Sequence, residues 1–276
     1  MNDESKIYKE YWTEVYNRCA PTYDHVGPRF FSHFGQRLVE LAEVGRGATV
    51  LDLGCGRGAI LFPAAQVVGP SGKVIGVDLA EEMVTRTAKA IRQSGLTNAE
   101  ARRMDAEALD FPDAFFDFVF CGFALYAFFD ANKALAEAFR VLKPSGVFAQ
   151  SLWGRELDPR WDGFRKMMKG YAKQLRPAPE GGISSRSDSA EIQALLTKAG
   201  FVNIQTVTEE QEFYLKDEGE FWEFDRSNAN RDFYERLEPS VRRQLKHEIF
   251  AMLGQMKQES GIPIMFQMLL TRAYKP

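Results

Sequence analysis

The stretch Val50-Leu51-Asp52-Leu53-Gly54-Cys55-Gly56-Arg57-Gly58-Ala59 decides the fold of this chain. A short apolar run ends beside an acid, a glycine-rich turn follows, and residues 60–68 can continue as a helix. Glycines let the backbone turn sharply and approach a ligand closely, and the N-terminus of a helix offers unpaired N–H groups. Strand, tight turn and helix in this order are typical of a site for a nucleotide-like ligand.

The glycine spacing also fits the fingerprint of dinucleotide-binding proteins, because Gly54, Gly56 and Ala59 satisfy G-x-G-x-x-G/A. Asp78 follows the glycines by about 20 residues, where an acid would hold ribose hydroxyls. The loop therefore predicts a ligand that contains adenosine. Asp52 lies just before the first glycine, which is a poor position for an anion if a pyrophosphate binds there. It suits a ligand with an ammonium and a sulfonium group, and S-adenosylmethionine carries both, whereas NAD does not.

Further segments extend this pattern along the chain. They are 77–83 (VDLAEEM), 104–112 (MDAEALDFP), 115–119 (FFDFV) and 140–147 (RVLKPSGV). With the glycine-rich stretch they resemble the motifs of class I S-adenosylmethionine-dependent methyltransferases, and in particular the ubiquinone/menaquinone-type C-methyltransferases and their natural-product relatives. The resemblance covers about residues 47–153. It implies the fold and the cofactor S-adenosylmethionine, and it leaves the methyl acceptor open.

The resemblance also implies roles for particular residues. Gly54, Cys55 and Gly56 are expected to contact the methionine and ribose portions of the cofactor. Asp78 is expected to accept hydrogen bonds from both ribose hydroxyls, and Asp105 to reach the adenine amino group. The full set of expected cofactor-binding residues is Tyr16, Tyr23, Asp52, Gly54, Cys55, Gly56, Asp78, Leu79, Met83, Asp105, Ala106 and Cys121.

Within this set, Leu79 and Met83 are expected to flank the adenine. Asp52 is expected to orient the glycine loop from behind. The structural alternative for Asp78 and Asp105 is that each carboxylate caps a helix at the end of a strand. The presence of several motifs in one chain favours the binding role over the cap for Asp78.

Strand and helix signals alternate through the middle of the chain. Apolar runs predict strands at 48–53, 73–78, 99–104, 115–123, 147–153, 201–207 and 264–273. Helices are predicted at 57–68, 80–94, 130–141 and 188–199. Repeated β-α units imply a parallel sheet whose ligands bind beyond the carboxyl ends of the strands. The fold class is therefore α/β, and the resemblance implies a Rossmann-like, mostly parallel sheet of seven strands with the last strand antiparallel.

The N-terminal segment 1–46 precedes this alternation. Aromatic residues at helical spacing predict a helix over 5–18, and a second amphipathic helix runs from about 30 to 44. The resemblance implies that this segment folds over the cofactor as a lid, with Tyr16 and Tyr23 as lid residues. The alternative is that these aromatic side chains simply pack on the core.

Two insertions interrupt the expected core of 47–154 and 188–276. Residues 155–187 predict a helical cap with eight Lys/Arg against four Asp/Glu, which either guides an anionic substrate or forms a solvated helix face. Residues 217–260 form a long connection with an aromatic stretch and an amphipathic helix. Because long insertions tend to be functional, this one is expected to complete the substrate chamber or build an oligomer interface, with packing on the sheet as the alternative.

A general base is harder to identify. Of the three histidines, His25 beside the expected lid is preferred over His33 and His247. Tyr126, just beyond the fourth strand, either orients the substrate or belongs to the core. No cluster of His, Asp and Glu has metal-ligand spacing, in contrast to cation-dependent catechol methyltransferases. No Asn/Asp-Pro-Pro-Tyr/Phe follows the fourth strand, which argues against methylation of nucleic-acid bases.

Composition narrows the class of protein further. A net charge of −3 and a pI near 5.8 argue against a nucleic-acid partner. No apolar run approaches the ~18 residues of a membrane span, and the N-terminus shows no signal-peptide pattern. Three cysteines without a C-x-x-C pair indicate a reducing, cytoplasmic location.

We therefore expect an S-adenosylmethionine-dependent enzyme that methylates carbon or oxygen of a largely apolar or aromatic small molecule, such as a natural product or a quinone-like acceptor. Aromatic residues crowd the three segments that should surround this acceptor. Nitrogen stays open because no clear base is found. Two other readings are a methyltransferase fold that catalyses a non-methylating cyclisation and an NAD-dependent oxidoreductase. Asp52 and the segment 104–112 argue against the oxidoreductase.

Overall fold

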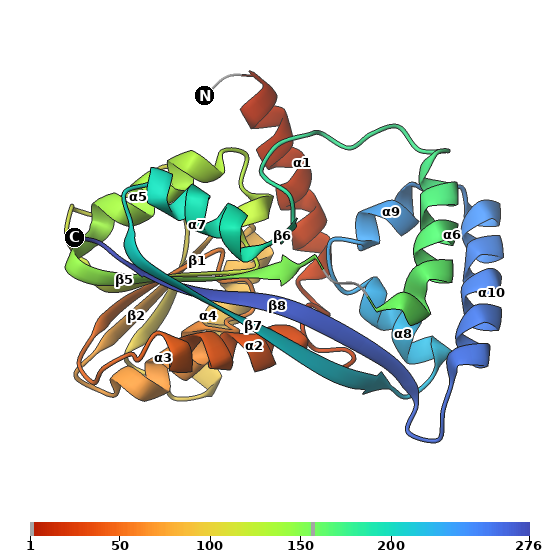
Figure 1. Ribbon diagram of the computed structural model, residues 1–276, viewed down its shortest axis with the longest axis horizontal. Coiled ribbons are helices and arrows are strands. Elements are labelled where there is room, and N and C mark those ends of the chain that lie inside the picture. The colour runs from red at the N-terminus through yellow and green to blue at the C-terminus, as the bar shows by residue number, and fades with distance from the viewer. Residues whose placement is uncertain (1–2, 156–157) are drawn as a thin grey trace.

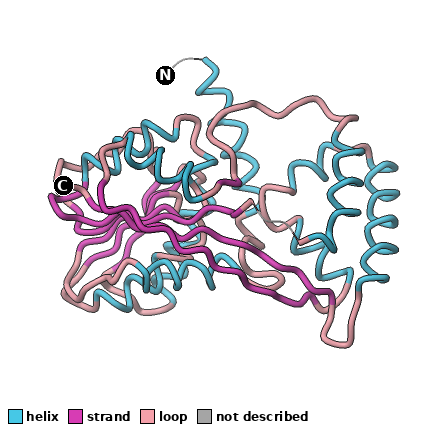
Figure 2. Tube along the Cα trace, in the orientation of Figure 1, coloured by secondary structure: helices cyan, strands magenta, loops and turns pink. Residues whose placement is uncertain are grey.

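The computed structural model describes residues 3–155 and 158–276. One eight-stranded sheet runs through the core with helices on both faces, and a further group of helices lies beyond one end of the sheet (Figure 1). Figure 2 shows the strands as a continuous twisted layer between these helices. The strand order is β3-β2-β1-β4-β5-β8-β7, and β6 pairs with the end of β5.

The main strands form where the sequence predicted strands. The bounds are β1 (Thr49–Leu53), β2 (Lys73–Asp78), β3 (Ala99–Arg103), β4 (Phe116–Gly122), β5 (Leu142–Gly154), β6 (Arg186–Ser187), β7 (Val202–Leu215) and β8 (Ile262–Tyr274). Within the sheet, the neighbouring strands β3, β2, β1, β4 and β5 pair in parallel. Strand β8 is antiparallel to both of its neighbours, β5 and β7. The expected mostly parallel sheet with an antiparallel last strand is confirmed. The short strand β6 was not predicted.

The helices also follow the predicted order. Their bounds are α1 (Asp3–Cys19), α2 (Phe30–Leu41), α3 (Leu61–Val68), α4 (Glu81–Gln93), α5 (Ala131–Val141), α6 (Asp162–Ala172), α7 (Ser189–Lys198), α8 (Glu218–Asp225), α9 (Arg231–Arg236) and α10 (Pro239–Met256), with 3₁₀ turns η1 (Leu125–Ala127) and η2 (Pro159–Trp161). The predicted start of α3 at residue 57 is wrong. Gly58 has a φ of 86°, which is incompatible with a helix, so α3 begins at Leu61.

The core consists of two apolar layers, one on each face of the sheet. One layer joins α2 and α3 to the sheet, and the other joins α5 and α7 to it. Residues 50–53 of β1 are all buried, and apart from Asp52 they are apolar. Strands of a parallel sheet covered on both faces read as continuous apolar runs, which is why their positions were predictable.

The hairpin of β7 and β8 extends well past the core. The two strands pair from Val202↔Tyr274 to Leu215↔Ile262. The sequence predicted β7 only as far as residue 207, because residues 208–211 are polar. Most of β7 is exposed or half-buried, so its polar residues face solvent and give no apolar run. In Figure 1 the far end of this hairpin lies beside α8 and α10, which together with α6 and α9 form what we call the helical lobe.

Helix α1 connects the core to the helical lobe. On one side Val15 and Cys19 pack against Ala80 and Met83 at the start of α4. On the other side the hydroxyl of Tyr11 donates to the carboxylate of Asp232 in α9, at 2.7 and 2.8 Å. The helix therefore lies over the ends of the strands rather than against a face of the sheet (Figure 1).

Within the described residues, no helix is both long enough and apolar enough to cross a membrane. The same residues contain no group of three side chains placed to hold a metal ion. Cys19, Cys55 and Cys121 are all buried and free.

Candidate active site

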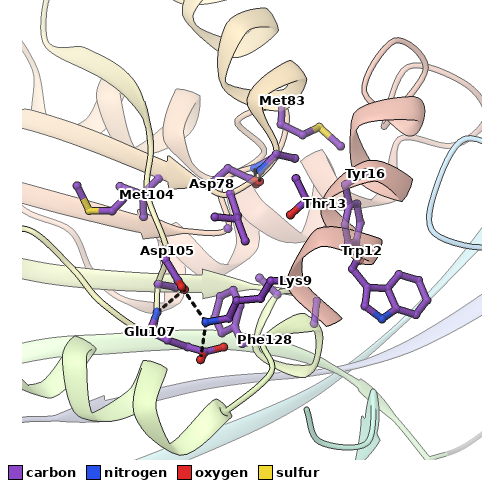
Figure 3. Close-up of a pocket in the computed structure, with 18 of the residues that line it drawn as sticks. Lys9, Trp12, Thr13, Tyr16, Asp78, Met83, Met104, Asp105, Glu107 and Phe128 are labelled. Carbon is purple, nitrogen blue, oxygen red and sulfur yellow. Dashed lines mark hydrogen bonds and ion pairs between the residues drawn. The ribbon is translucent and has the colours of Figure 1, made fainter. Parts of the chain in front are cut away.

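A cavity opens at the carboxyl ends of β1, β2 and β4, beneath α1 (Figure 3). It encloses about 790 Å³, the open space at its mouth included. Most of the cofactor-binding residues expected from the sequence line it: Tyr16, Tyr23, Gly54, Gly56, Asp78, Leu79, Met83, Asp105 and Ala106. The strand-end acids and the N-terminal tyrosines, far apart in the sequence, are thus brought to one cavity.

The glycine loop presses closely against the segment after β4. Gly54 has a φ of 66°, and a Cβ added there would lie 2.5 Å from the Cβ of Ala124. No side chain fits at this position without moving the neighbouring backbone. The loop backbone therefore forms one wall of the cavity, as the sequence predicted.

Asp78 ends β2 and faces the cavity (Figure 3). One carboxylate oxygen accepts from the N–H of Gly56 and the other from the N–H of Ala80, each at 2.9 Å. Burial raises the pKa of Asp78, while the hydrogen bonds from the backbone oppose this rise. A carboxylate accepts about four hydrogen bonds, so Asp78 keeps capacity for hydroxyl groups of a ligand.

Asp105 follows β3 and has a partner that the sequence did not reveal. Lys9 of α1 donates to Asp105 and to Glu107, each at 2.7 Å, as the dashed lines of Figure 3 show. The N–H of Glu107 also donates to Asp105 at 2.9 Å. Burial lowers the pKa of Lys9, but the bonds to Asp105 and Glu107 outweigh it and the net shift is upward. These two ion pairs join α1 to the loop after β3.

Asp52 and Cys55 lie behind the glycine loop instead of along the main cavity. Both line a smaller cavity on its far side. Asp52 is 2% exposed, and its Oδ2 has no hydrogen-bond partner among the described residues. Burial and then the charge of Asp78 raise the pKa of Asp52 well above its ordinary value. This placement agrees with the expected role of Asp52 behind the loop, whereas the Cys55 side chain packs toward Gly76 of β2.

Cys121 is fully buried in the apolar layer between the sheet and helices α5 and α7, and it does not line the main cavity. Its neighbours Gly122 and Phe123 do line it. The prediction placed Cys121 at the end of the strand, but β4 continues to Gly122 and the Cys121 side chain points into the core.

A second cavity lies beside the first, between the core and the helical lobe. It encloses about 1310 Å³, open space included. Its wall is largely aromatic, and we call it the aromatic cavity: Phe30, Phe31, Tyr126, Trp153, Trp161, Phe164, Phe221, Phe224 and Phe266 all line it. These residues come from α2, the turns η1 and η2, the ends of β5 and β8, and helices α6 and α8 of the helical lobe. The N-terminal segment and both insertions thus contribute to one enclosure.

Tyr16 and Tyr23 line both cavities. Their rings meet edge to face at 6.3 Å, and the ring of Tyr23 stacks on Phe31 at 4.9 Å. Burial raises the pKa of both hydroxyls well above the ordinary value. The two tyrosines therefore form a neutral wall that the two cavities share.

The family model described as "Methyltransferase domain" matches residues 45–214. The chain belongs to this methyltransferase family. The match includes the glycine loop and the ends of β2, β3 and β4, which together build the first cavity.

Two curated relatives of this chain are themselves named as methyltransferases. The aklanonic acid methyltransferase DauC of Streptomyces sp. (strain C5) is 41% identical over 149 residues, which are 54% of this chain and 67% of that protein. The nocamycin O-methyltransferase of Saccharothrix syringae is 41% identical over 132 residues, which are 48% of this chain and 47% of that protein. The chain thus spans about half the length of the second relative.

Among solved structures, a SAM-dependent methyltransferase from Aquifex aeolicus superposes with a TM-score of 0.51 and 25% identity. The match covers 75% of this chain and 93% of that chain. The protein is therefore an S-adenosylmethionine-dependent methyltransferase, and the nicotinamide oxidoreductase suggested by the glycine spacing is set aside.

The first cavity suits S-adenosylmethionine. It offers a buried carboxylate at Asp78, a glycine loop at Gly54 that a Cβ would block, and apolar side chains at Leu79 and Met83. These are the features that a ribose, a closely approaching backbone contact and an adenine ring require.

The two catalytic candidates from the sequence lie in different places. Tyr126 lines the aromatic cavity, and burial raises the pKa of its hydroxyl, against a hydrogen bond from Trp153. His25 is exposed and lines neither of the two cavities, and burial of its ring together with the charges of Arg57 and Arg29 lowers its pKa. The geometry places Tyr126 in the wall of the aromatic cavity and leaves His25 outside both cavities.

Proposed function

We propose that this methyltransferase methylates an aromatic, largely apolar small molecule bound in the aromatic cavity. The observation that carries the proposal is that Tyr16 and Tyr23 line both cavities, so the two ligands share one wall. The aromatic lining suits a fused ring system with a few polar substituents. The names of the two curated relatives, aklanonic acid methyltransferase and nocamycin O-methyltransferase, support a natural-product acceptor and a role in secondary metabolism.

In this proposal the chain acts mainly by positioning its two ligands and excluding water. S-adenosylmethionine, when bound, supplies a methyl group activated by the adjacent sulfonium. Asp78 would hold the ribose hydroxyls, and Asp105 would accept from the adenine amino group. Helix α1 would cover both ligands, because Lys9 and Tyr16 on that helix line the first cavity.

The aromatic cavity offers no histidine among its described residues. Of its carboxylates, Asp158 is paired with Arg160, and Asp225 accepts from Tyr234 at 2.5 Å and from Asn230 at 2.8 Å. Tyr126 keeps its proton at neutral pH, because its pKa is raised. We propose that Tyr126 donates a hydrogen bond that orients the acceptor and that it does not act as a base.

The proposed division of labour follows the segments of the chain. Residues 1–46 form the lid, and residues 47–154 and 188–276 form the cofactor-binding core. The insertions 155–187 and 217–260 complete the acceptor chamber, which is supported by Phe164 and Phe224 lining the aromatic cavity. The three free cysteines are consistent with work in the cytoplasm. The use of 217–260 as an oligomer interface stays a prediction.

Incubation of the purified protein with S-adenosylmethionine and a panel of hydroxylated naphthoquinones and anthraquinones tests the proposal. We expect S-adenosylhomocysteine and a product heavier by one methyl group, both detected by mass spectrometry. The name of the nocamycin relative favours oxygen as the accepting atom, and tandem mass spectrometry of the product separates O- from C-methylation. Consumption of an acceptor without S-adenosylhomocysteine would instead support the cyclisation reading.

A further inference from the structure

One cation that lines the aromatic cavity, Arg186, forms no ion pair among the described residues. Arg186, in β6, lines the cavity at the point where β6 pairs with Trp153 at the end of β5. Its Nη1 donates to the carbonyl oxygen of Gly154 at 2.8 Å. No carboxylate in the two described ranges, 3–155 and 158–276, forms an ion pair with it.

The other charged side chains that line this cavity do have partners. Arg165 forms an ion pair with Asp162 and donates to the carbonyl of Asp158 at 2.8 Å. Asp158 and Arg160 form a two-point pair, with Nε–Oδ1 at 2.9 Å and Nη2–Oδ2 at 2.7 Å. Asp225 is satisfied by Tyr234 and Asn230. Among the described charged residues that line this cavity, Arg186 is thus the one whose charge has no charged or side-chain partner.

The surroundings of Arg186 disfavour its charged form. Burial lowers its pKa, and the nearby charge of Arg165 lowers it further. Arg186 is half-buried. A partly desolvated guanidinium without a counter-ion is unfavourable, and an anion with matching geometry that enters the site compensates for the lost hydration. Only one of its five N–H donors has a partner in the described protein, so a fork of donors remains for a ligand.

We infer that the methyl acceptor carries a carboxylate, which the Arg186 guanidinium binds inside the aromatic cavity. Arginine binds planar carboxylates through two parallel hydrogen bonds, which fixes orientation as well as charge. The aromatic wall holds the ring system, and Arg186 sets which edge of it points toward β6. The inference rests on the proposed function, because it assigns the acceptor to this cavity.

A matched pair of ligands tests the inference. 1-Hydroxy-2-naphthoate and 1-hydroxy-2-naphthamide have nearly the same shape, and only the first carries a charge at pH 7.5. Calorimetric titration of the full chain, saturated with S-adenosylhomocysteine, gives the affinity for each. We expect the acid to bind about 10- to 100-fold more tightly than the amide, as charge-assisted hydrogen bonds in a partly buried site predict.

Variants of the arginine then locate the effect. Arg186→Gln should remove the preference for the acid while the amide and S-adenosylhomocysteine bind as they do to the wild type. Arg186→Lys should retain a smaller preference, because it keeps the charge and loses the two-point geometry. Arg155→Gln is the matched control, since Arg155 is exposed, pairs with Asp188 and Glu191, and does not line the cavity. It should keep the full preference.

The outcomes separate this inference from the proposed function. Equal binding of acid and amide to the wild type overturns the inference and leaves the aromatic cavity as the acceptor site. A preference that survives in Arg186→Gln also overturns it. If neither ligand binds to the wild type, the assignment of the acceptor to this cavity fails, and the inference fails with it.

Discussion

The two cavities of this methyltransferase differ in how the chain builds them. The cofactor cavity is made by loops at the carboxyl ends of neighbouring parallel strands, with glycines and acids at fixed places. The aromatic cavity is made by α2, the ends of β5 and β8, the short strand β6 and the helical lobe. The cofactor cavity is determined by local backbone geometry, which a short sequence motif is enough to predict. The aromatic cavity depends on side chains from separate segments that meet only in the folded protein.

The largest expected effect concerns the cofactor cavity. Asp78→Ala should weaken binding of S-adenosylhomocysteine by about 100-fold or more, because two hydrogen bonds to a charged group are lost. Calorimetric titration measures it, and an unchanged melting temperature would show that the fold survives. Affinity equal to that of the wild type would remove the assignment of Asp78 to the ribose.

The next effect concerns the link between α1 and the loop after β3. Lys9→Ala should weaken binding of S-adenosylhomocysteine by about tenfold, because Glu107, whose side chain is 4% exposed, loses its cation and α1 is held less tightly. Hydrogen exchange of α1 should increase as well. Lys6→Ala is the matched control, since Lys6 on the same helix makes only an exposed pair with Glu10 at 3.9 Å. Equal losses in both variants would contradict the role of Lys9.

A smaller effect is expected on the acceptor side. Phe164→Ala removes an aromatic ring that lines the aromatic cavity and does not line the cofactor cavity. The KM for an aromatic acceptor should rise by about fivefold, in keeping with the loss of part of an apolar contact area. Affinity for S-adenosylhomocysteine should stay the same. A change in cofactor affinity instead would mean that the two cavities are not independent.

The smallest effect is on stability and comes from Asp52. Its pKa is raised in the folded protein, so its contribution to the free energy of unfolding is fully present below the ordinary pKa and is lost as the pH rises through the raised value. Asp52→Asn should therefore gain stability relative to the wild type as the pH rises above about 4, the ordinary pKa of an aspartate. Urea unfolding at several pH values measures the difference. A constant difference across this range would show that Asp52 does not titrate as expected.

Much of the cofactor site was predictable from the sequence. The glycine loop and Asp78 lie in or beside apolar runs of a parallel sheet, and the ends of such strands converge at one edge whatever the details of packing. Lys9 was not predictable, because its partners Asp105 and Glu107 lie more than ninety residues away in the sequence. Only the packing of α1 across the strands brings these charges together.

The acceptor side was predicted in outline only. The aromatic stretch in 217–260 and the positive charge of 155–187 were visible, but no local pattern shows which of eight cationic residues is enclosed. Arg186 differs from Arg155 because the short strand β6 places its guanidinium in the cavity wall. The length of β7 was underestimated because strands were predicted from apolar runs, and the exposed part of β7 carries polar residues instead.

The β7–β8 hairpin also bears on how this protein can acquire new substrates. Its inner half completes the sheet of the core, while residues such as Phe266 in its outer half line the aromatic cavity. Because successive residues of a strand face opposite sides, insertion of one residue directly after Phe266 would turn its side chain away from the cavity while the inner half of β8 keeps its pairing with β5. The inner half and the cofactor site would keep their register. One continuous hairpin therefore allows the enzyme to diversify its acceptors while its methyl donor stays the same.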